Sequence, residues 1–191
     1  MTVAHRERVV RAATSSFLAH GYRSSVDEIA RRAGVAKQTV YHHFPSKDEL
    51  FKEVARDLSA RVLVELESQP QDLREGLLRF ALAYRQRILG AQGVSAFRTL
   101  VPEVPRFRQL ARAVYASSVG EMVRRLAGWL ARAMDAGQLR REDPVFAAEM
   151  LLGMLGGLDR IKRLFGVNHE AESEARRAAR IVDCFLRTLE K

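Results

Sequence analysis

The stretch GVAKQTVYHHFPSKDELF, residues 34–51, decides the fold of the first part of the chain. It opens on a glycine, a residue that commonly ends a helix, and Phe44-Pro45 stops any helix that follows. Between these two breaks, residues 37–43 have Val40 as their aliphatic side chain, and the others are polar or aromatic. The stretch therefore predicts a turn followed by a short helix that exposes most of its side chains.

A second short helical segment, residues 26–33, lies immediately before this turn. Ser25 stands at its N-cap and Glu28 follows three residues later, which is the spacing of a capping box. Gly34 ends the segment, and a longer helix over residues 3–20 precedes both short ones. Two short helices joined by a tight glycine turn and braced by a longer helix predict a helix-turn-helix, in which the second short helix reads DNA.

The rest of the chain also shows a helical period, and no segment alternates like a half-buried strand. We therefore expect an all-α protein of about nine helices, in which Ser117, Ser118 and Gly120 could bend the seventh. The expected helices cover residues 3–20, 26–33, 37–43, 46–69, 73–90, 94–101, 105–136, 144–165 and 170–189.

The composition of the chain indicates which kinds of binding partner and which kinds of site it can have. The formal net charge is +9, which favours a polyanion such as nucleic acid or an acidic membrane face. The single cysteine, Cys184, excludes an intramolecular disulfide framework and a multi-cysteine metal site, and its apolar neighbours predict that it is buried. The N-terminus has no signal-peptide pattern, and the longest apolar window, residues 145–158, is too short to span a bilayer. We expect a soluble, cytoplasmic protein without a membrane partner.

The two short helices separate apolar from polar side chains as a DNA-reading motif requires. The inward positions are apolar: Ile29, Ala30, Val35, Val40 and Phe44. The outward positions of the reading helix are Lys37, Gln38, Thr39, Tyr41, His42 and His43. Such donor-rich side chains suit base edges and phosphates in a major groove, so the expected partner is double-stranded DNA.

The order of residues in FLAHGYRSSVDEIARRAGVAKQTVYHHFPSKDEL, residues 17–50, resembles the DNA-binding domain of the TetR (tetracycline repressor) family of transcriptional regulators. The resemblance extends over residues 5–55, and the remainder of the chain resembles the family only in its helical layout and length. It implies a helix-turn-helix DNA-binding domain over residues 1–50 and an effector-binding and dimerisation domain over residues 51–191.

The resemblance also implies a role for each matching residue. The side chains expected to face base edges are Lys37, Gln38, Thr39 and His42. Those expected to contact the DNA backbone are Ser25, Tyr41, His43 and Lys47, the last as a clamp on a phosphate at the start of the next helix.

Two residues depart from the family pattern. Ala36 stands where a serine or threonine usually caps the reading helix, so one backbone amide lacks a partner, at a cost of about 1 kcal/mol. Gln38 stands where many members have glycine, and a glutamine can bond to adenine through two hydrogen bonds. The base preference therefore cannot be taken over from relatives.

Chemical alternatives to DNA reading have little support. His42 and His43 are adjacent on a helix and point about 100° apart, so they cannot share one metal ion. No nucleophile–base pair, metal set or cofactor fingerprint is visible, so we expect neither an enzyme nor a cofactor. Gly153 and Gly157 lie within a helix and favour close helix packing over a phosphate loop.

For the C-terminal part, the resemblance implies a cavity for an unknown small-molecule effector and a homodimer contact. Aromatic and apolar residues of the central helices are the candidates for the cavity: Phe80, Tyr84, Phe97, Leu100, Phe107, Tyr115, Met122 and Trp129. A hydrophobic ligand is expected, with an anionic end that Arg98, Arg106 and Arg108 would suit. The candidates for the dimer contact lie on the last two helices: Leu151, Gly153, Met154, Gly157, Ala178, Val182, Phe185 and Leu189.

The function expected from the sequence is a dimeric repressor that a hydrophobic ligand releases from a palindromic operator. The alternative is an architectural DNA-binding protein without effector control. That alternative leaves the long C-terminal part of the chain without a purpose.

Overall fold

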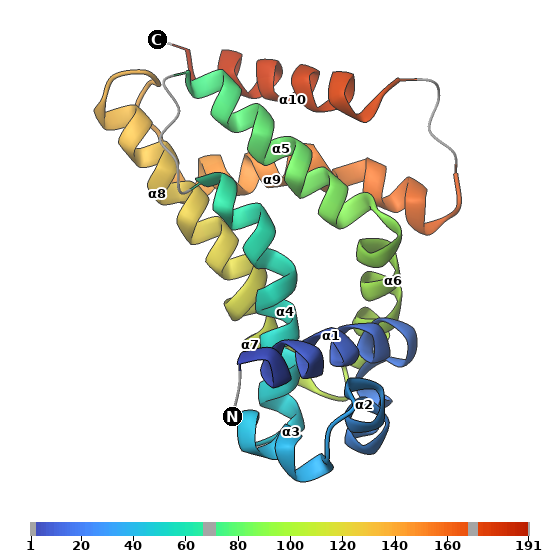
Figure 1. The fold of residues 1–191 in the computed structure, drawn as a ribbon. Coiled ribbons are helices and arrows are strands. Elements are labelled where there is room, and N and C mark those ends of the chain that lie inside the picture. Colours follow the sequence, from blue (N-terminus) through green and yellow to red (C-terminus); the bar gives the residue numbers. More distant parts are fainter. Residues whose placement is uncertain (1–2, 67–71, 168–171, 191) are drawn as a thin grey trace. The chain divides into compact units, whose positions relative to one another are not determined.

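The computed structural model describes residues 3–66, 72–167 and 172–190, and within these ranges the chain is helical and contains no strand (Figure 1). The α-helices are α1 (Val3–His20), α2 (Val26–Ala33), α3 (Lys37–His43), α4 (Lys47–Leu63), α5 (Leu73–Leu89), α6 (Ala91–Leu100), α7 (Arg108–Tyr115), α8 (Glu121–Asp135), α9 (Pro144–Leu164) and α10 (Glu174–Thr188). Short 3-10 turns occupy η1 (Gly21–Arg23), η2 (Val64–Leu66) and η3 (Val101–Glu103). The all-α class predicted from the sequence is confirmed.

Helices α7 and α8 form one unbroken run, because a π-helical turn, η4 (Ala116–Gly120), joins them. Counted in this way, the described ranges contain the nine helical segments that the sequence predicts. The departure from α-helical geometry falls where the sequence predicts a bend, and the hydroxyl of Ser118 donates to the carbonyl of Val114 at 2.6 Å there. A hydroxyl that bonds back to the preceding turn commonly accompanies such distortions.

Some predicted helix ends differ from the structure. The run predicted to start at Pro105 begins at Arg108, because η3 and a turn occupy the residues around two prolines, which lack the backbone N–H that a helix interior needs. The predicted start of the last helix at residue 170 and the predicted fading of α4 at residue 69 lie outside the described residues.

The chain divides into two compact units that are not contiguous in sequence. Unit 1 comprises Met1–Leu58 and Ser95–Ser118, and unit 2 comprises Ser59–Val94 and Val119–Lys191. The domain boundary after residue 50 stays a prediction. Packing groups Ser95–Ser118, a segment that begins within α6 and ends within η4, with the N-terminal helices.

Unit 1 encloses one apolar core beneath the two short helices. Its buried residues are Val9, Val10, Ala13, Phe17, Val26, Ile29, Ala30, Ala33, Val40, Phe44, Leu50, Phe51, Val54 and Leu110. The segment from α6 to α7 is tied to this core by polar contacts as well, since the hydroxyls of Ser95 and Thr99 donate to the carbonyl of Leu18 at 3.0 and 3.2 Å. These contacts attach the segment to the C-terminal end of α1.

Unit 2 is built from α5, α8, α9 and α10, whose mutual contacts dominate this unit. Its core is formed by apolar side chains such as Leu77, Phe80, Leu126, Leu130, Leu151, Leu155, Val182 and Phe185. Cys184 of α10 is exposed, which contradicts the predicted burial: its neighbours Val182 and Phe185 face the core, and Cys184 lies on the opposite side of the helix.

One charged side chain lies inside unit 2. Arg85 of α5 is 2% exposed, and its guanidinium donates to the carbonyl of Leu155, to Asp159 at 2.9 Å and to Glu174 at 2.7 Å. Arg177 also donates to Asp159. Burial of the carboxyl raises the pKa of Asp159, but the hydrogen bonds and positive charges of the two arginines outweigh this effect, so the pKa is lowered overall.

This network sits where α9 is irregular. The backbone is non-helical at Gly157, with φ 7° and ψ −121°, between the two α9 residues that Arg85 contacts. At such a kink, helical carbonyls lose their usual donors. The guanidinium therefore supplies a donor to the kinked helix and ties it to the first residue of α10.

We expect Arg85→Met to lower the free energy of unfolding by about 3 kcal/mol, because the buried carboxylate of Asp159 loses a cationic partner. Urea unfolding followed by circular dichroism measures this change. The matched control is Arg74→Met, which breaks the more exposed pair with Asp183 and should leave the midpoint almost unchanged. Equal effects of the two substitutions would contradict the role given to Arg85.

Candidate nucleic-acid interface

Helix α2 is fixed at both ends by the residues that the sequence singles out. The Ser25 hydroxyl accepts the backbone N–H of Glu28 at 3.1 Å, and Gly34 ends the helix in the left-handed region, with φ 64°. That conformation favours glycine because a side chain would be strained there. The guanidinium of Arg8 donates to the carbonyl of Gly34 at 3.0 Å and so connects the turn to α1.

Helix α3 follows the turn and is held by its inner face. Val40 and Phe44 are buried, at 1% and 4% exposure, against the core of unit 1. Ala36 is the N-cap in an extended conformation, and its side chain makes no capping hydrogen bond, as the sequence predicts. The helix is therefore positioned by packing and by the stop at its C-terminal end.

The outer face of α3 presents Lys37, Gln38, Tyr41 and His42 as exposed side chains, whereas Thr39 is half-buried. These are donors and acceptors of varied length on a helix that is short enough to enter a major groove. Within the described ranges, Gln38 makes no side-chain hydrogen bond, so its amide is available for a base edge.

Lys37 has an intramolecular partner that the sequence analysis does not anticipate. Its ammonium donates to Asp27 of α2 at 2.9 Å, and this hydrogen bond, followed by the charge of Asp27, raises the pKa of Lys37. Both side chains are exposed, and exposed pairs of this kind contribute little to stability. A DNA phosphate or base can therefore displace Asp27 at small cost.

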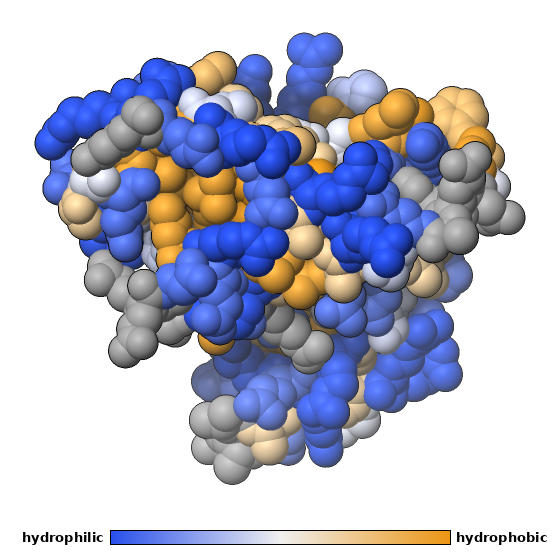
Figure 2. Space-filling model, turned by 90° about the horizontal axis from the view of Figure 1, so that it is seen from above, coloured by the Kyte–Doolittle hydropathy of each residue, from blue (hydrophilic) through white to orange (hydrophobic). Residues whose placement is uncertain are grey.

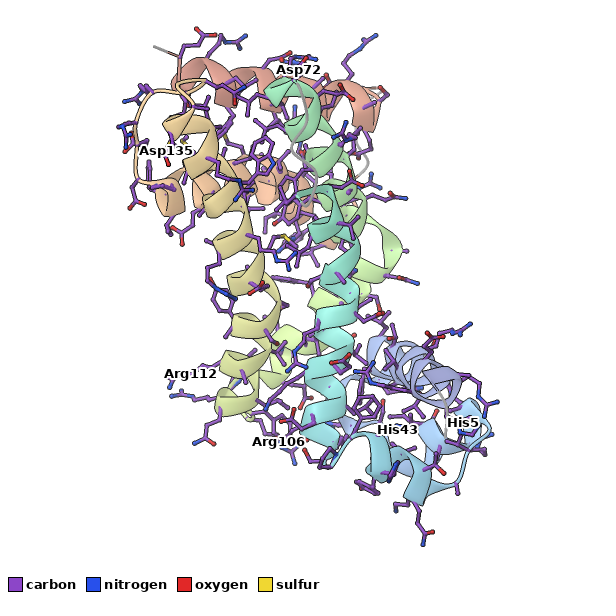
Figure 3. The ribbon with its side chains drawn as sticks, turned by 60° about the vertical axis from the view of Figure 1, so that its left-hand side comes forward. His5, His43, Asp72, Arg106, Arg112 and Asp135 are labelled. Atoms are coloured by element: carbon purple, nitrogen blue, oxygen red, sulfur yellow. The ribbon has the colours of Figure 1, made fainter. Side chains whose placement is uncertain are left out.

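His43 is placed differently from its neighbours on α3. It is half-buried, and its Nε2 atom is shielded from solvent without a hydrogen-bond partner. Burial lowers the pKa of His43, and the nearby charges of His42, His5 and Arg6 lower it further. Figure 3 shows His43 on α3 and His5 on α1 at the same end of unit 1. In this conformation Nε2 of His43 is not accessible to a phosphate, so the predicted contact with the DNA backbone would use Nδ1 or require a rotation of the ring.

Lys47 begins α4 beside the reading helix. Its Nζ atom lies 4.3 Å from the centre of the Tyr22 ring, and the Tyr22 hydroxyl donates to Asp48. Burial lowers the pKa of Lys47, while the charge of Asp48 acts in the opposite direction. The predicted clamp residue is thus a partly enclosed ammonium group with an aromatic face behind it.

A basic groove of about 360 Å³ lies between α1 and α2, and the sequence analysis does not predict it. Its lining residues are Arg8, Arg11, Ala12, Ser15, Arg32 and Ala33. The spacing of residues 8, 12 and 15 on α1 places them along one side of that helix, and this periodicity could have revealed the groove. The three guanidinium groups add to the positive potential of unit 1.

Comparison with known proteins matches both parts of the chain to one family. Residues 9–54 match the family described as "Bacterial regulatory proteins, tetR family", and residues 75–190 match the "AefR-like transcriptional repressor, C-terminal domain". The chain belongs to the TetR family. It is a DNA-binding transcriptional regulator of that family, with α2 and α3 as its helix-turn-helix.

Individual TetR-family relatives agree with this assignment. The chain is 37% identical over 87 residues to the A-factor receptor protein of Streptomyces griseus, a match that covers 44% of this chain and 32% of that receptor. Its fold is similar to that of a TetR-family regulator from Mesorhizobium loti, with 28% identity, a TM-score of 0.81 and 100% of each chain covered. It is also similar to the flavonoid-responsive regulator FrrA, with 30% identity, a TM-score of 0.76 and 97% of each chain covered.

The effector candidates of this TetR-family chain fall into two groups. Phe80, Tyr84, Met122 and Trp129 lie in unit 2 and are buried in its core. Phe97, Leu100, Phe107 and Tyr115 lie in unit 1, where Tyr115 is 56% exposed and Leu100 and Phe107 pack against the core beneath the reading helix. The two groups therefore belong to different units.

The dimer candidates also divide into two kinds. Leu151, Ala178, Val182, Phe185 and Leu189 are buried inside unit 2, because their helix faces point towards α5 and α8, so they are core residues of the protomer. Gly153 and Gly157 are exposed and Met154 is half-buried. The sequence period correctly marks an apolar face, but it does not distinguish a core from an interface.

Within the described ranges, no group of three or more histidine, cysteine or acidic side chains is arranged to hold a metal ion. The helices described also lack any segment with the length and apolar character needed to cross a membrane.

We expect Ala36→Ser to raise the free energy of unfolding of unit 1 by about 1 kcal/mol, because a serine hydroxyl can accept the amide at the start of α3 that now lacks a side-chain cap. Thermal unfolding measures the change. The matched control is Ser25→Ala, which removes the cap of α2 and should act in the opposite direction by a similar amount. A destabilised Ala36→Ser variant would contradict this account of α3.

Proposed function

We propose that this TetR-family chain acts as a homodimeric repressor that binds a palindromic operator and is released when a largely hydrophobic ligand binds unit 2. The single observation that supports operator reading is the outer face of α3, where Gln38, Tyr41 and His42 are exposed on a helix whose inner residue Val40 is fixed in the core. A reading helix of this length covers one half-site, so two copies are needed for a full operator.

The surface that would pair the two copies lies on α9. Beyond the irregularity at Gly157, Leu158 and Ile161 of α9 are 66% and 47% exposed and share one side of the helix, and Phe165, which follows as the C-cap residue, is 80% exposed. Phe146 is a further exposed apolar residue near the start of the same helix. Exposed apolar residues of this size commonly mark interaction surfaces.

Hydrophobic residues are also gathered elsewhere on the molecular surface, as one face of the molecule shows. Figure 2 shows hydrophobic residues gathered in patches that are bordered by hydrophilic side chains on the face seen from above. A hydrophobic centre surrounded by a polar rim is the usual composition of a homodimer contact.

The effector would contact the aromatic cluster of unit 2. Phe80 and Tyr84 stack with their ring centroids 5.9 Å apart, and Trp129 belongs to the same core. Burial raises the pKa of Tyr84, and the hydrogen bond from Arg160 partly offsets this, so the buried hydroxyl is neutral and is bonded at one side. A planar aromatic ligand with one polar end fits these groups, and flavonoid response of the similar regulator FrrA supports that class.

Ligand control would act through the equilibrium between two conformations. A ligand shifts such an equilibrium only by its difference in affinity for the two states, and a few kcal/mol are sufficient. Helix α4 is the element best suited to carry the change, because it starts at Lys47 and contributes residues to both units.

The operator experiment uses the DNA that flanks the chain's own coding region, in a footprint and a shift assay over a range of salt concentrations. We expect a protected symmetric site and two chains in each complex. Gln38→Ala should change the base preference, whereas Lys47→Met should weaken binding to all sequences and lower the slope of log K against log salt by about 0.9.

Two controls separate the parts of this proposal. Ile161→Glu places a charge in the proposed α9 contact and should yield a monomer by sedimentation, with loss of the operator complex but an unchanged helical spectrum. Absence of any protected site at low salt would reject the operator, and a dimeric Ile161→Glu variant would reject the α9 contact alone.

The effector experiment uses Trp129, the only tryptophan in the chain, as a reporter within unit 2. Titration with planar aromatic compounds should quench its fluorescence and release operator DNA over the same concentration range. Long-chain fatty acids serve as the matched hydrophobic control and should do so more weakly. If no compound loosens the DNA complex, the architectural alternative is favoured over a ligand-responsive repressor.

A further inference from the structure

Unit 1 contains a row of two adjacent aromatic rings with a charged side chain at each end, the second of which is the clamp lysine. The guanidinium of Arg106 lies 5.3 Å from the centre of the Phe107 ring, and the Phe107 and Tyr22 ring centroids are 4.8 Å apart. The Tyr22 ring in turn carries the ammonium of Lys47 at 4.3 Å. The row thus connects the turn before α7, where Figure 3 shows Arg106, to the start of α4.

Tyr22 is held on more than one side within this row. Its ring meets Phe51 edge to face, with centroids 5.3 Å apart, and its hydroxyl donates to Asp48. Burial raises the pKa of Tyr22, and the hydrogen bond and charge of Asp48 raise it further, so the hydroxyl keeps its proton and remains a donor. Phe107 covers another part of the ring, at an interplanar angle of 60°.

Phe107 can hold this position because its segment is attached to unit 1 independently. Arg23 of η1 pairs with Glu103 at 3.3 Å, and Leu110 of α7 is buried in the same core. Thr99 packs closely against Gly21, where an added Cβ would lie 2.9 Å from the Thr99 methyl group. The contacts of α6, η3 and α7 with the rest of unit 1 therefore hold the Phe107 ring against Tyr22.

We propose that Phe107 and Tyr22 are positioning residues for Lys47: together they form an aromatic seat that holds its ammonium ready for a DNA phosphate. This inference rests on the proposed function. A free lysine side chain loses about 2 kcal/mol of rotamer entropy when it is fixed, and a seat that restricts it beforehand reduces that loss on binding. The attraction between an ammonium group and an aromatic ring contributes further.

Through this aromatic seat, the α6–α7 segment can change the affinity for DNA in a way that does not depend on the base sequence. Withdrawal of Phe107 removes one of the contacts that hold the Tyr22 ring, so the ring supports Lys47 less firmly while α3 keeps its own contacts. The consequence is weaker binding to every duplex, with an unchanged order of preference among sequences. Any signal that displaces the turn at Phe107 would loosen DNA by this route.

The test is a double-mutant cycle on duplex DNA, with Phe107→Leu and Lys47→Met alone and together. Phe107→Leu keeps apolar bulk but removes the ring. It should reduce the slope of log K against log salt by about 0.9, so that the ratio of wild-type to variant affinity falls by about 3.5-fold between 50 and 200 mM salt. In the Lys47→Met background, Phe107→Leu should have no further effect on either quantity.

Two readouts separate positioning from a general loss of structure. In Leu110→Ala, a buried residue of the same segment is truncated without loss of a ring, so the melting temperature should fall while the salt slope stays unchanged. Without DNA, the ε protons of Lys47 should show an upfield ring-current shift in the nuclear magnetic resonance spectrum, and this shift should collapse in Phe107→Leu and persist in Leu110→Ala.

Additive effects in the cycle, an unchanged salt slope, or tighter binding by Phe107→Leu would overturn the proposal, the last because it would mean that the ring sequesters the lysine. Failure of the wild type to bind any duplex would instead overturn the proposed function. In that case the ring-current shift still decides whether the seat exists, so the two failures are distinguishable.

Discussion

The ring of Phe51 is the contact on which the geometry of unit 1 depends. It meets Phe17 of α1 at 4.8 Å and Tyr22 of η1 at 5.3 Å, each edge to face, and so joins three elements at one point. Aromatic pairs of this geometry combine a large buried area with a preferred orientation. Because Phe51 lies in the second turn of α4, the start of that helix is fixed against α1. The reading helix and the clamp lysine take their relative positions from this junction.

Unit 2 is specified by a different kind of interaction. Its helices bury long runs of leucine and alanine, which allow more than one register because neighbouring turns present similar surfaces. Arg85 removes this freedom, since it must reach Leu155, Asp159 and Glu174 at the same time. A displacement of α10 by one turn would leave a buried charge without its partner, and that state is strongly disfavoured. Apolar burial thus supplies the stability, and the ionic contacts select the register.

The sequence predicts local structure well where residues that start or end a helix lie close to the helix ends. The limits of α2 and α3 agree with the prediction without an offset, because Ser25, Gly34 and Phe44-Pro45 act within a few residues of the ends they define. Association of the α6–α7 segment with unit 1 could not be predicted, since it depends on single contacts such as that of Thr99 with Leu18 across the chain. The sequence pattern also could not predict that most of the candidate dimer residues are buried within the protomer, because a core face and an interface face of a helix have the same hydrophobic period.

The structure also changes how the readout of bases is divided along α3. The ammonium of Lys37 already pairs with the carboxylate of Asp27, so a DNA acceptor that takes this hydrogen bond competes with a negative charge. Gln38 has no such partner within the described ranges, and its amide offers a donor and an acceptor together. An amide discriminates among base edges by geometry, whereas an ammonium responds mainly to charge. The discriminating contact of this regulator is therefore expected at Gln38, the position at which it departs from the glycine of many relatives.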